Sequence, residues 1–391
     1  MPVINSIAAM KDEMTEWRQD IHMHPELGFE EFRTSNLVAE KLEAWGIEVH
    51  RGIGQTGVVG VLRGSGESSK SIGLRADMDA LPMDEENDFA HKSRHEGKFH
   101  GCGHDGHTTM LLGAAKYLAE TRNFDGTVHF IFQPAEEGKG GGKAMVDDGL
   151  FERFDSDEVY GMHNWPAIPA GEAAIRPGPM MAAADHFNVT ISATGGHAAM
   201  PHYTVDPVLI ATQIVQAFQT LVSRNTNPIE PAVLSVTQMH IGSADNVIAD
   251  GGWMQGTVRT FSRQVQDDIE AGMKRIVEST AATFGAEATL TYNRGYPATV
   301  NHAEQTEKAA RVAERVMGDG KVNRDFEPVM GAEDFSFMLE KRPGAYIAIG
   351  QAGGPSSCMV HNPRYDFNDE ILPVGASFFA TLVESELARA G

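Results

Sequence analysis

Hydrophobic residues in the first half of the chain follow two periods. The ranges 6–20 and 31–46 carry apolar side chains at helical spacing, and Gly46 suits a helix C-terminus. Short apolar runs predict strands at 58–62, 71–75, 127–132 and 159–163, with a Leu- and Ala-rich helix from about 108 to 120 between the second and the third. This alternation favours an α/β sheet with helices packed on both faces.

The pattern changes near residue 184. From there the chain predicts strand 187–193, helix 207–223, strands 232–240 and 253–260, helix 264–284 and strand 288–294. This β-α-β-β-α-β order is the ferredoxin-like split motif. We therefore expect a mixed-sheet α/β domain at 1–183 and 295–391, with a ferredoxin-like α+β domain inserted at 184–294. A helix at 303–318 and a strand at 345–349 resume the first domain.

The composition narrows the classes of function. The 391 residues carry a formal net charge of −22, which disfavours binding to nucleic acids or to anionic membrane surfaces. Only two cysteines are present, unlike in a disulfide-stapled secreted protein. The first residues show no basic segment followed by an apolar stretch, so we expect no signal peptide and a cytoplasmic protein.

The densest group of metal-binding residue types lies at 100–107. Its sequence, His-Gly-Cys-Gly-His-Asp-Gly-His, sets three histidines and a cysteine among glycines that allow close backbone approach. Thiolate and imidazole together suit zinc and neighbouring transition metals. The segment precedes the predicted helix at 108, and a helix N-terminus lowers a thiol pKa, which favours the thiolate. We predict a metal-binding loop here.

Three further segments carry His or Glu in similar positions. They are Gln133–Gly138, Gly161–Trp165 and His361–Pro363. Taken singly, each is more often an acidic turn or a structural histidine. Functional groups of open α/β sheets gather at the carboxyl ends of strands. Together, the four segments therefore predict a metal site built from loops at one edge of the sheet.

Seven segments also occur in the order found in one enzyme family. They are His22–Gly28, Leu74–Pro82, Gly101–His107, Gln133–Gly138, Gly161–His163, Gly195–His202 and Gly331–Phe335. Together they resemble the M20D branch of the M20 metallopeptidases, over about residues 15 to 385. That branch includes hippurate hydrolases, N-acyl-amino-acid amidohydrolases, acetyl-diaminopimelate deacetylases and auxin-conjugate hydrolases. The resemblance implies an amidohydrolase that cleaves N-acyl amino acids to a carboxylic acid and a free amino acid.

The resemblance also implies the composition of the metal centre. Two divalent ions (Zn, Mn, Co or Ni) would be held by five ligands: Cys102, His104, Glu137, His163 and His361. Cys102 would bridge the two ions, and Glu136 would be the general base. The inserted domain would be the family's lid and dimerisation domain, so a homodimer or a homotetramer is expected.

Further roles are expected for four residues outside this set. His197, in a glycine-rich loop of the lid, would stabilise the oxyanion, and Asn246 with Arg259 resembles the family's clamp for the substrate carboxylate. A salt bridge at a strand edge is an equal alternative for Arg259. Asp79 is a candidate for orienting a metal-bound histidine, and Asp77, which neighbours it, is open to the same role.

Other interpretations of the same residues stay open. Cys102 could be the nucleophile of a metal-independent cysteine hydrolase, although Glu136 and Glu137 would then have no role. The chain could also be a metal-dependent binding protein on a peptidase scaffold. Cys358, spaced Cys-x-x-His from His361, is an alternative metal ligand. His107 and Glu333 are expected to support the site rather than to bind metal. The acyl group and the amino acid of the substrate are not specified by the motifs.

Overall fold

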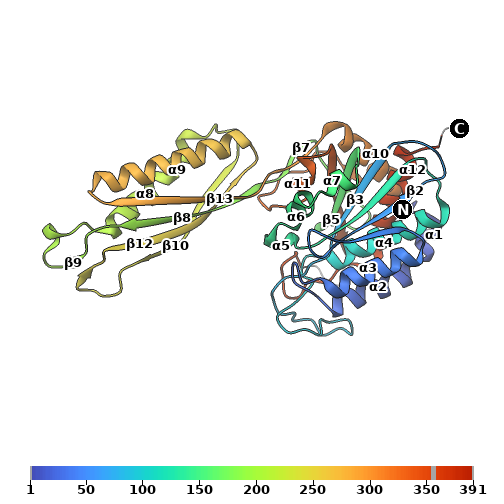
Figure 1. Ribbon diagram of the computed structural model, residues 1–391, viewed down its shortest axis with the longest axis horizontal. Helices are drawn as coiled ribbons and strands as arrows, with labels where there is room; N and C mark the ends of the chain where they lie inside the picture. The colour runs from blue at the N-terminus through green and yellow to red at the C-terminus, as the bar shows by residue number, and fades with distance from the viewer. Residues whose placement is uncertain (1, 354–357, 390–391) are drawn as a thin grey trace. The chain divides into compact units, whose positions relative to one another are not determined.

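A mixed sheet of eight strands, in the order β1-β2-β4-β3-β5-β16-β6-β15, organises the larger part of the chain (Figure 1). The computed structural model describes residues 2–353 and 358–389. The central pairs β4–β3, β3–β5 and β5–β16 are parallel, whereas β1–β2 and β2–β4 are antiparallel. The strands are β1 (Glu48–Ile53), β2 (Gly57–Arg63), β3 (Ser71–Asp77), β4 (Thr127–Gln133), β5 (Glu158–Pro169), β6 (Ala173–Ala174), β15 (Val322–Asn323) and β16 (Gly344–Ala352).

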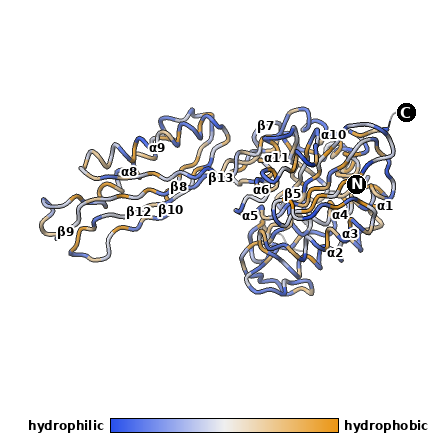
Figure 2. The backbone as a smooth tube through the Cα atoms, in the orientation of Figure 1, coloured by the Kyte–Doolittle hydropathy of each residue, from blue (hydrophilic) through white to orange (hydrophobic). Residues whose placement is uncertain are grey.

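Helices cover both faces of this sheet, as predicted (Figure 1). Alternate residues of β4, namely Val128, Phe130 and Phe132, are buried in the main hydrophobic core, and Figure 2 shows apolar positions concentrated on the central strands. On this side lie α1 (Asn5–Ala9), α2 (Lys11–Met23), α3 (Phe32–Ala44), α4 (His104–Thr121), α10 (Ala303–Met317) and α12 (Leu372–Glu386). Shorter helices lie elsewhere: α5 (Glu136–Lys139), α6 (Gly141–Asp147), α7 (Leu150–Arg153) and α11 (Ser336–Leu339).

Two details of the sequence prediction are wrong. The helix expected near residue 108 begins at His104, because its first three turns are buried on every side and show no apolar period. His104 and His107 are therefore helical residues rather than loop residues. His163 lies inside β5, which continues to Pro169, and not at the end of a strand. Strand β1 and helix α12 were not predicted.

The remaining residues form a second unit with its own core. The chain divides into Met1–Met180, Thr299–Glu327 and Asp334–Gly391 as one unit, and Met181–Ala298 with Pro328–Glu333 as the other. The short return segment joins the second unit because the Ala182 N–H donates to the carbonyl groups of Val329 and Gly331. The predicted inserted domain, 184–294, falls inside these limits.

The second unit is a four-stranded antiparallel sheet, in the order β10-β12-β8-β13, with two helices on one face. Its elements are β8 (Ala183–Ser192), α8 (Pro207–Thr220), β10 (Ala232–Ile241), β12 (Gly251–Thr260), α9 (Arg263–Thr283) and β13 (Glu287–Tyr296). This is the predicted β-α-β-β-α-β order. Helices α8 and α9 bury residues such as Ile214, Phe218 and Met273 against one face of the sheet. Among the described residues, no helix is both long and apolar enough to span a membrane.

A buried group of charges ties α2 to α4 and to the C-terminal segment. His22 lies between two carboxylates, with its Nδ1 2.7 Å from Asp105 and its Nε2 3.3 Å from Glu85. One turn earlier, Arg18 pairs with Asp366 at 3.0 Å and Asp369 at 2.7 Å. Burial by itself lowers the pKa of His22, but the hydrogen bonds and charge of Asp105 outweigh it and raise that pKa to about 9.

This raised pKa predicts a pH-dependent contribution to stability. Since the folded-state pKa exceeds the unfolded one, the contribution is complete below the ordinary histidine pKa and is lost as the pH rises through about 9. His22→Gln should therefore lower the free energy of unfolding more near about pH 6 than near about pH 10. Urea unfolding of the metal-loaded protein at both values measures this, with His24→Gln at the same helix end as the control. A loss independent of pH would contradict the assignment.

Candidate metal centre

A left-handed glycine begins the helix that carries the first candidate ligands. Gly103, with φ of +93°, precedes α4, and a Cβ at this position would lie 2.4 Å from Oδ1 of Asn164 and 2.6 Å from the Tyr365 hydroxyl. Only glycine combines this backbone conformation with so close an approach. The sharp turn places Cys102 just before the helix and His104 at its first residue, beside β5 and the C-terminal segment.

Hydrogen bonds determine which ring nitrogen each buried histidine presents. Nδ1 of His104 donates to the backbone carbonyl of Asp79 at 2.9 Å, and Nδ1 of His163 donates to the carbonyl of Asn164 at 2.6 Å. Each ring therefore keeps the lone pair on Nε2 in its neutral form. Nε2 of His163 lies 3.3 Å from Sγ of Cys102. Nε2 of His104 is buried and has no hydrogen-bond partner. Both nitrogens are thus available as ligands.

The Cys102 thiol is less acidic than the sequence suggested. We predicted that the helix N-terminus would lower its pKa, but burial and the nearby charge of Glu137 raise it. A buried thiolate here needs a cation as its partner, either a metal ion or a protonated histidine. His361 lies near the same thiol, with its Nε2 3.2 Å from the Glu137 carboxylate. Hydrogen bonds to Cys102 and Glu137 raise the pKa of His361 to about 10.

A tight turn after β4 presents the two glutamates. Ala135, with φ of +52°, and Gly138, with φ of +75°, flank Glu136 and Glu137. The two carboxylate oxygens of Asp79 accept the backbone N–H groups of Glu136 and Glu137, at 3.0 and 2.9 Å. With its main-chain carbonyl also bonded to His104, Asp79 holds three members of the site in place. Asp79 therefore positions the turn, and its orientation of a metal-bound histidine stays a prediction.

Asp77 and His107 form a separate buried hydrogen-bonded pair. Asp77 accepts hydrogen bonds from Nδ1 of His107 at 2.7 Å and from Arg75 at 2.6 Å. Although burial opposes it, the charges of His104 and Arg75 hold the pKa of Asp77 well below its usual range. Nε2 of His104 lies 3.8 Å from Asp77, too far for a hydrogen bond. Asp77 therefore anchors His107 and Arg75 directly, not His104.

The donor atoms gather into groups of the size that a metal ion requires. Cys102, His104 and His163 offer ligand atoms within 4.8 Å of one another, and so do Cys102, Glu137 and His361. The unpartnered Nε2 of His104 fits a cation, because a buried acceptor without a partner is otherwise costly. Cys102 belongs to both groups, whereas Cys358 belongs to none of the groups found within residues 2–353 and 358–389.

The other predicted residues belong to the second unit. His197 lies on β9 (Gly196–His197), which pairs with β11 (Val247–Ile248), and the carbonyl of Asn246 accepts the N–H of Ala198 at 3.0 Å. His197 and Asn246 are thus neighbours in one small ribbon. Arg259 is on β12 and hydrogen-bonds to Thr257 and to the carbonyl of Val258. No ion pair of Arg259 is found in the described part of the chain, so the alternative of a salt bridge is not supported.

Comparison with known proteins assigns the chain to a family. The model of the peptidase family M20/M25/M40 matches residues 73–385. The chain belongs to this family. Its predicted resemblance to the M20 metallopeptidases is thereby confirmed, and the protein is a metal-dependent hydrolase.

Individual relatives cover nearly the whole chain. A hippurate hydrolase from Campylobacter jejuni is 41% identical over 382 residues, which are 98% of each chain. An N-acetylcysteine deacetylase from Bacillus subtilis is 36% identical over 93% of this chain and 94% of its own. A solved Bacillus subtilis structure, described as a dinuclear metal-binding peptidase from the M20 family, is 32% identical, with a TM-score of 0.85 over 97% of this chain and 99% of its own.

Sequence analysis missed two residues that shape the M20 centre. Asn164 contributes its carbonyl to His163, while its amide group donates to the Tyr365 hydroxyl at 2.8 Å and to Gln351 at 3.0 Å. Its place directly after His163 was the available signal. Tyr365 is fully buried against Gly103, and nothing in its local sequence indicated this.

The contacts of Asp79 predict that it controls metal affinity. Asp79→Ala removes the acceptor of two backbone N–H groups in the turn of Glu136 and Glu137, so metal binding should weaken by about 10- to 100-fold. Chelator competition measures the affinity. Asp84→Ala is the control, since Asp84 also accepts a backbone N–H, that of Gly97, in an exposed turn. Equal affinities in wild type and Asp79→Ala would exclude this positioning role.

Proposed function

We propose that this M20 enzyme hydrolyses the amide bond of N-acyl amino acids, releasing a carboxylic acid and a free amino acid. The observation that carries the proposal is the position of Glu136, a buried carboxylate 4.0 Å from Nε2 of His104 and adjacent to Glu137. The names of two relatives, a hippurate hydrolase and an N-acetylcysteine deacetylase, support the same substrate class.

Two divalent ions would be held by Cys102, His104, Glu137, His163 and His361. The two groups of donor atoms that share Cys102 support a bridging position for its sulfur. When bound, such ions polarise a carbonyl group and lower the pKa of water to near neutrality. Thiolate and imidazole suit zinc, and manganese, cobalt and nickel are the other candidates.

Glu136 acts as the proton carrier of the reaction. Its carboxylate accepts a proton from the attacking water and returns it to the amine nitrogen as the carbon–nitrogen bond breaks. A carboxylate suits both steps because it binds and releases a single proton. Asp79 keeps the carboxylate in place by fixing the backbone N–H of Glu136. Water attack and amine departure thereby use one acid–base group.

His197 would stabilise the oxyanion of the tetrahedral intermediate. Its Nδ1 accepts the backbone N–H of Ala199 at 3.0 Å, so in the neutral ring the proton lies on Nε2. This tautomer can donate to a developing negative charge. The pairing of Val247 with His197 supports a shared role for His197 and Asn246 on the same substrate.

Arg259 would bind the α-carboxylate of the substrate. It lines a hollow of about 420 Å³ in the second unit, with His186, Asn188 and Asn293 from neighbouring strands. Burial lowers the pKa of Arg259 against the opposing charge of Asp185, and no described carboxylate forms an ion pair with it. An arginine in this state favours an anionic ligand.

The second unit would also be the site of self-association. We propose a homodimer or homotetramer assembled through it, with the protein working in the cytoplasm. The exposed apolar side chains of Val208, Leu209 and Val247, all in this unit, support an interface there.

Glu136→Gln tests the assignment of the general base. The variant should retain both ions but lose about 10²- to 10⁴-fold in kcat on N-benzoylglycine or N-acetyl amino acids, because the side-chain amide of glutamine cannot accept the proton from water. Metal content and turnover are measured on the same sample. Glu137→Gln is the matched control and should lose metal instead. Normal turnover by Glu136→Gln would overturn the role.

Arg259→Ala tests recognition of the substrate carboxylate. With an N-acyl amino acid, kcat/KM should fall by about 10- to 100-fold, the usual effect of losing a charge-assisted hydrogen bond. With the corresponding N-acyl amino acid amide, which lacks the carboxylate, the value should change little. Arg263→Ala, an exposed arginine on α9, serves as the control. Equal losses on both substrates would exclude the clamp.

A further inference from the structure

The loop between α2 and α3 packs against the turn that carries Glu136. Within this loop, residues 26–31, a Cβ at Gly28 would lie 2.9 Å from both Cα and Cβ of Ala135. Glycine is needed here for space, because the main chain of the loop lies directly against Ala135. Farther along the turn, Nζ of Lys139 donates to the carbonyl of Gly28 at 2.8 Å. The loop and the turn are therefore in close contact.

The same loop is also joined to the segment that follows β3. The N–H of Ala80 donates to the carbonyl of Glu26 at 2.8 Å, and Leu27 and Ala80 form a parallel bridge. Ala80 directly follows Asp79, whose carboxylate accepts the N–H of Glu136. The loop therefore contacts both segments on which the position of the proposed base depends.

The last residue of the loop, Glu31, is fully buried and accepts a hydrogen bond on each carboxyl oxygen. Its Oε1 accepts the N–H of Ala135 at 2.8 Å, and its Oε2 accepts the hydroxyl of Thr56 at 2.5 Å. Ala135 is left-handed, with φ of +52°. Such a conformation costs free energy in an alanine and persists only where the surroundings determine it. Glu31 is one of these constraints, placed directly before Glu136.

The carboxyl group of Glu31 serves the turn as an oxygen acceptor rather than as a charge. Burial raises the pKa of Glu31 to about 7, although the Thr56 hydrogen bond opposes the shift, and the charge of Asp79 adds to it. The group is therefore partly uncharged at neutral pH. Either form offers an oxygen to the N–H of Ala135, and so would the amide carbonyl of a glutamine at this position.

We propose that Glu31 is a positioning residue for the amide hydrolysis, acting through the turn that carries Glu136. The inference rests on the proposed function, because it takes Glu136 as the general base. Asp79 fixes the N–H of Glu136 itself, whereas Glu31 fixes the N–H of the residue before it. Glu137 keeps its own hydrogen bond to Asp79. Loss of the Glu31 carboxyl group should therefore disturb the base more than the proposed metal ligand.

Kinetics of Glu31 variants in the metal-loaded protein test the proposal. Glu31→Ala should lower kcat on N-acetyl amino acids by about 10- to 100-fold, since a misplacement of about 1 Å can cost that much. KM and metal content should change little. Glu31→Gln should keep most of the wild-type kcat. In the Glu136→Gln background, Glu31→Ala should cause no further loss, because both changes then act on the same proton transfer.

Hydrogen exchange gives a measurement that does not depend on turnover. Exchange of the segment 133–139, followed by mass spectrometry, should be faster in Glu31→Ala and unchanged in Glu31→Gln, because only alanine removes the acceptor of the Ala135 N–H. Thr56→Val removes only the second hydrogen bond of the carboxyl group and should cause a smaller loss of kcat. This milder variant keeps the proposal testable where Glu31→Ala does not fold.

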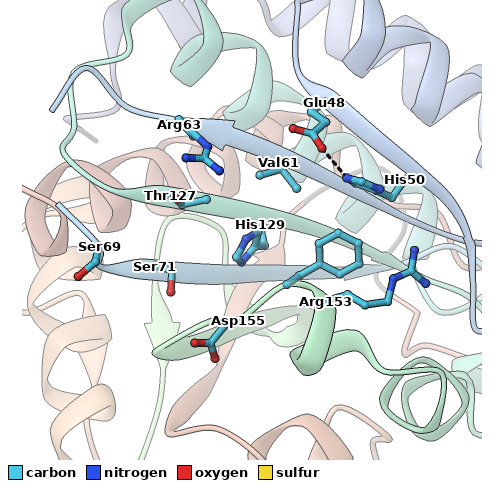
Figure 3. Close-up of a pocket in the computed structure, with 11 residues that line it drawn as sticks. Glu48, His50, Val61, Arg63, Ser69, Ser71, Thr127, His129, Arg153 and Asp155 are labelled. Atoms are coloured by element: carbon cyan, nitrogen blue, oxygen red, sulfur yellow. Dashed lines mark hydrogen bonds and ion pairs between the residues drawn. The ribbon is translucent and has the colours of Figure 1, made fainter. Parts of the chain in front are cut away.

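Matched controls lie at the opposite ends of the same strands. Figure 3 shows Glu48 and Thr127 in a hollow of about 400 Å³ on the sheet. Thr127 begins β4, the strand that leads to the turn, and pairs with Arg63 at the far end of β2 from Thr56. Glu48→Ala and Thr127→Val should leave kcat and the exchange of the segment 133–139 unchanged.

Any of three results would overturn the positioning role. They are normal kcat in Glu31→Ala or Thr56→Val, equal losses in Glu31→Ala and Glu31→Gln, or a further loss when Glu31→Ala is added to Glu136→Gln. Each of them leaves the proposed function standing. Normal turnover by Glu136→Gln would instead remove the proposed base, and this inference with it.

Discussion

The carboxylate of Asp79 is the contact on which the M20 centre depends. It lies just beyond β3 and accepts the backbone N–H groups of Glu136 and Glu137, which lie just beyond β4. Strands β3 and β4 are parallel neighbours, so their carboxyl ends meet at the same sheet edge. The main-chain carbonyl of Asp79 also receives Nδ1 of His104. Through one residue, the sheet therefore sets the places of Glu136, Glu137 and His104, the proposed base and two of the proposed ligands.

Left-handed backbone conformations also position the donor atoms of the centre. Gly103 and Ala135 are both left-handed, and each stands immediately before a segment that carries donor atoms. His361 is also left-handed, with φ of +63°, and its N–H donates to the carbonyl of Gly101, the residue directly before Cys102. Such conformations cost free energy in residues other than glycine, and they persist where the surrounding structure determines them. The site thus rests on backbone conformations that the surrounding structure holds in place.

Sequence analysis predicted the mixed sheet with helices on both faces, the β-α-β-β-α-β order of the second unit and the residues that meet at the centre, because strand order and family motifs both reflect long-range constraints. The predictions failed where complete burial removes the alternation of apolar and polar residues. The first turns of α4 are buried on all sides, so no helical period marked its start at His104. Burial also reversed the expected shift of the Cys102 pKa. The partners of Asp77 and the place of Tyr365 depend on chain segments far apart in sequence, which local patterns do not encode. The strands of the second unit were easier to predict, since buried and exposed residues alternate along them and helices cover only one face of its sheet.

The close pairing of His361 with Glu137 makes metal loading an exchange reaction. In the geometry described above, the imidazole is basic enough to hold a proton between the thiol and the carboxylate. An ion that takes His361 as a ligand must displace that proton, and a thiolate ligand requires the loss of another. Occupancy of the proposed centre would therefore be coupled to the proton concentration, with acid opposing metal binding and mild alkali favouring it.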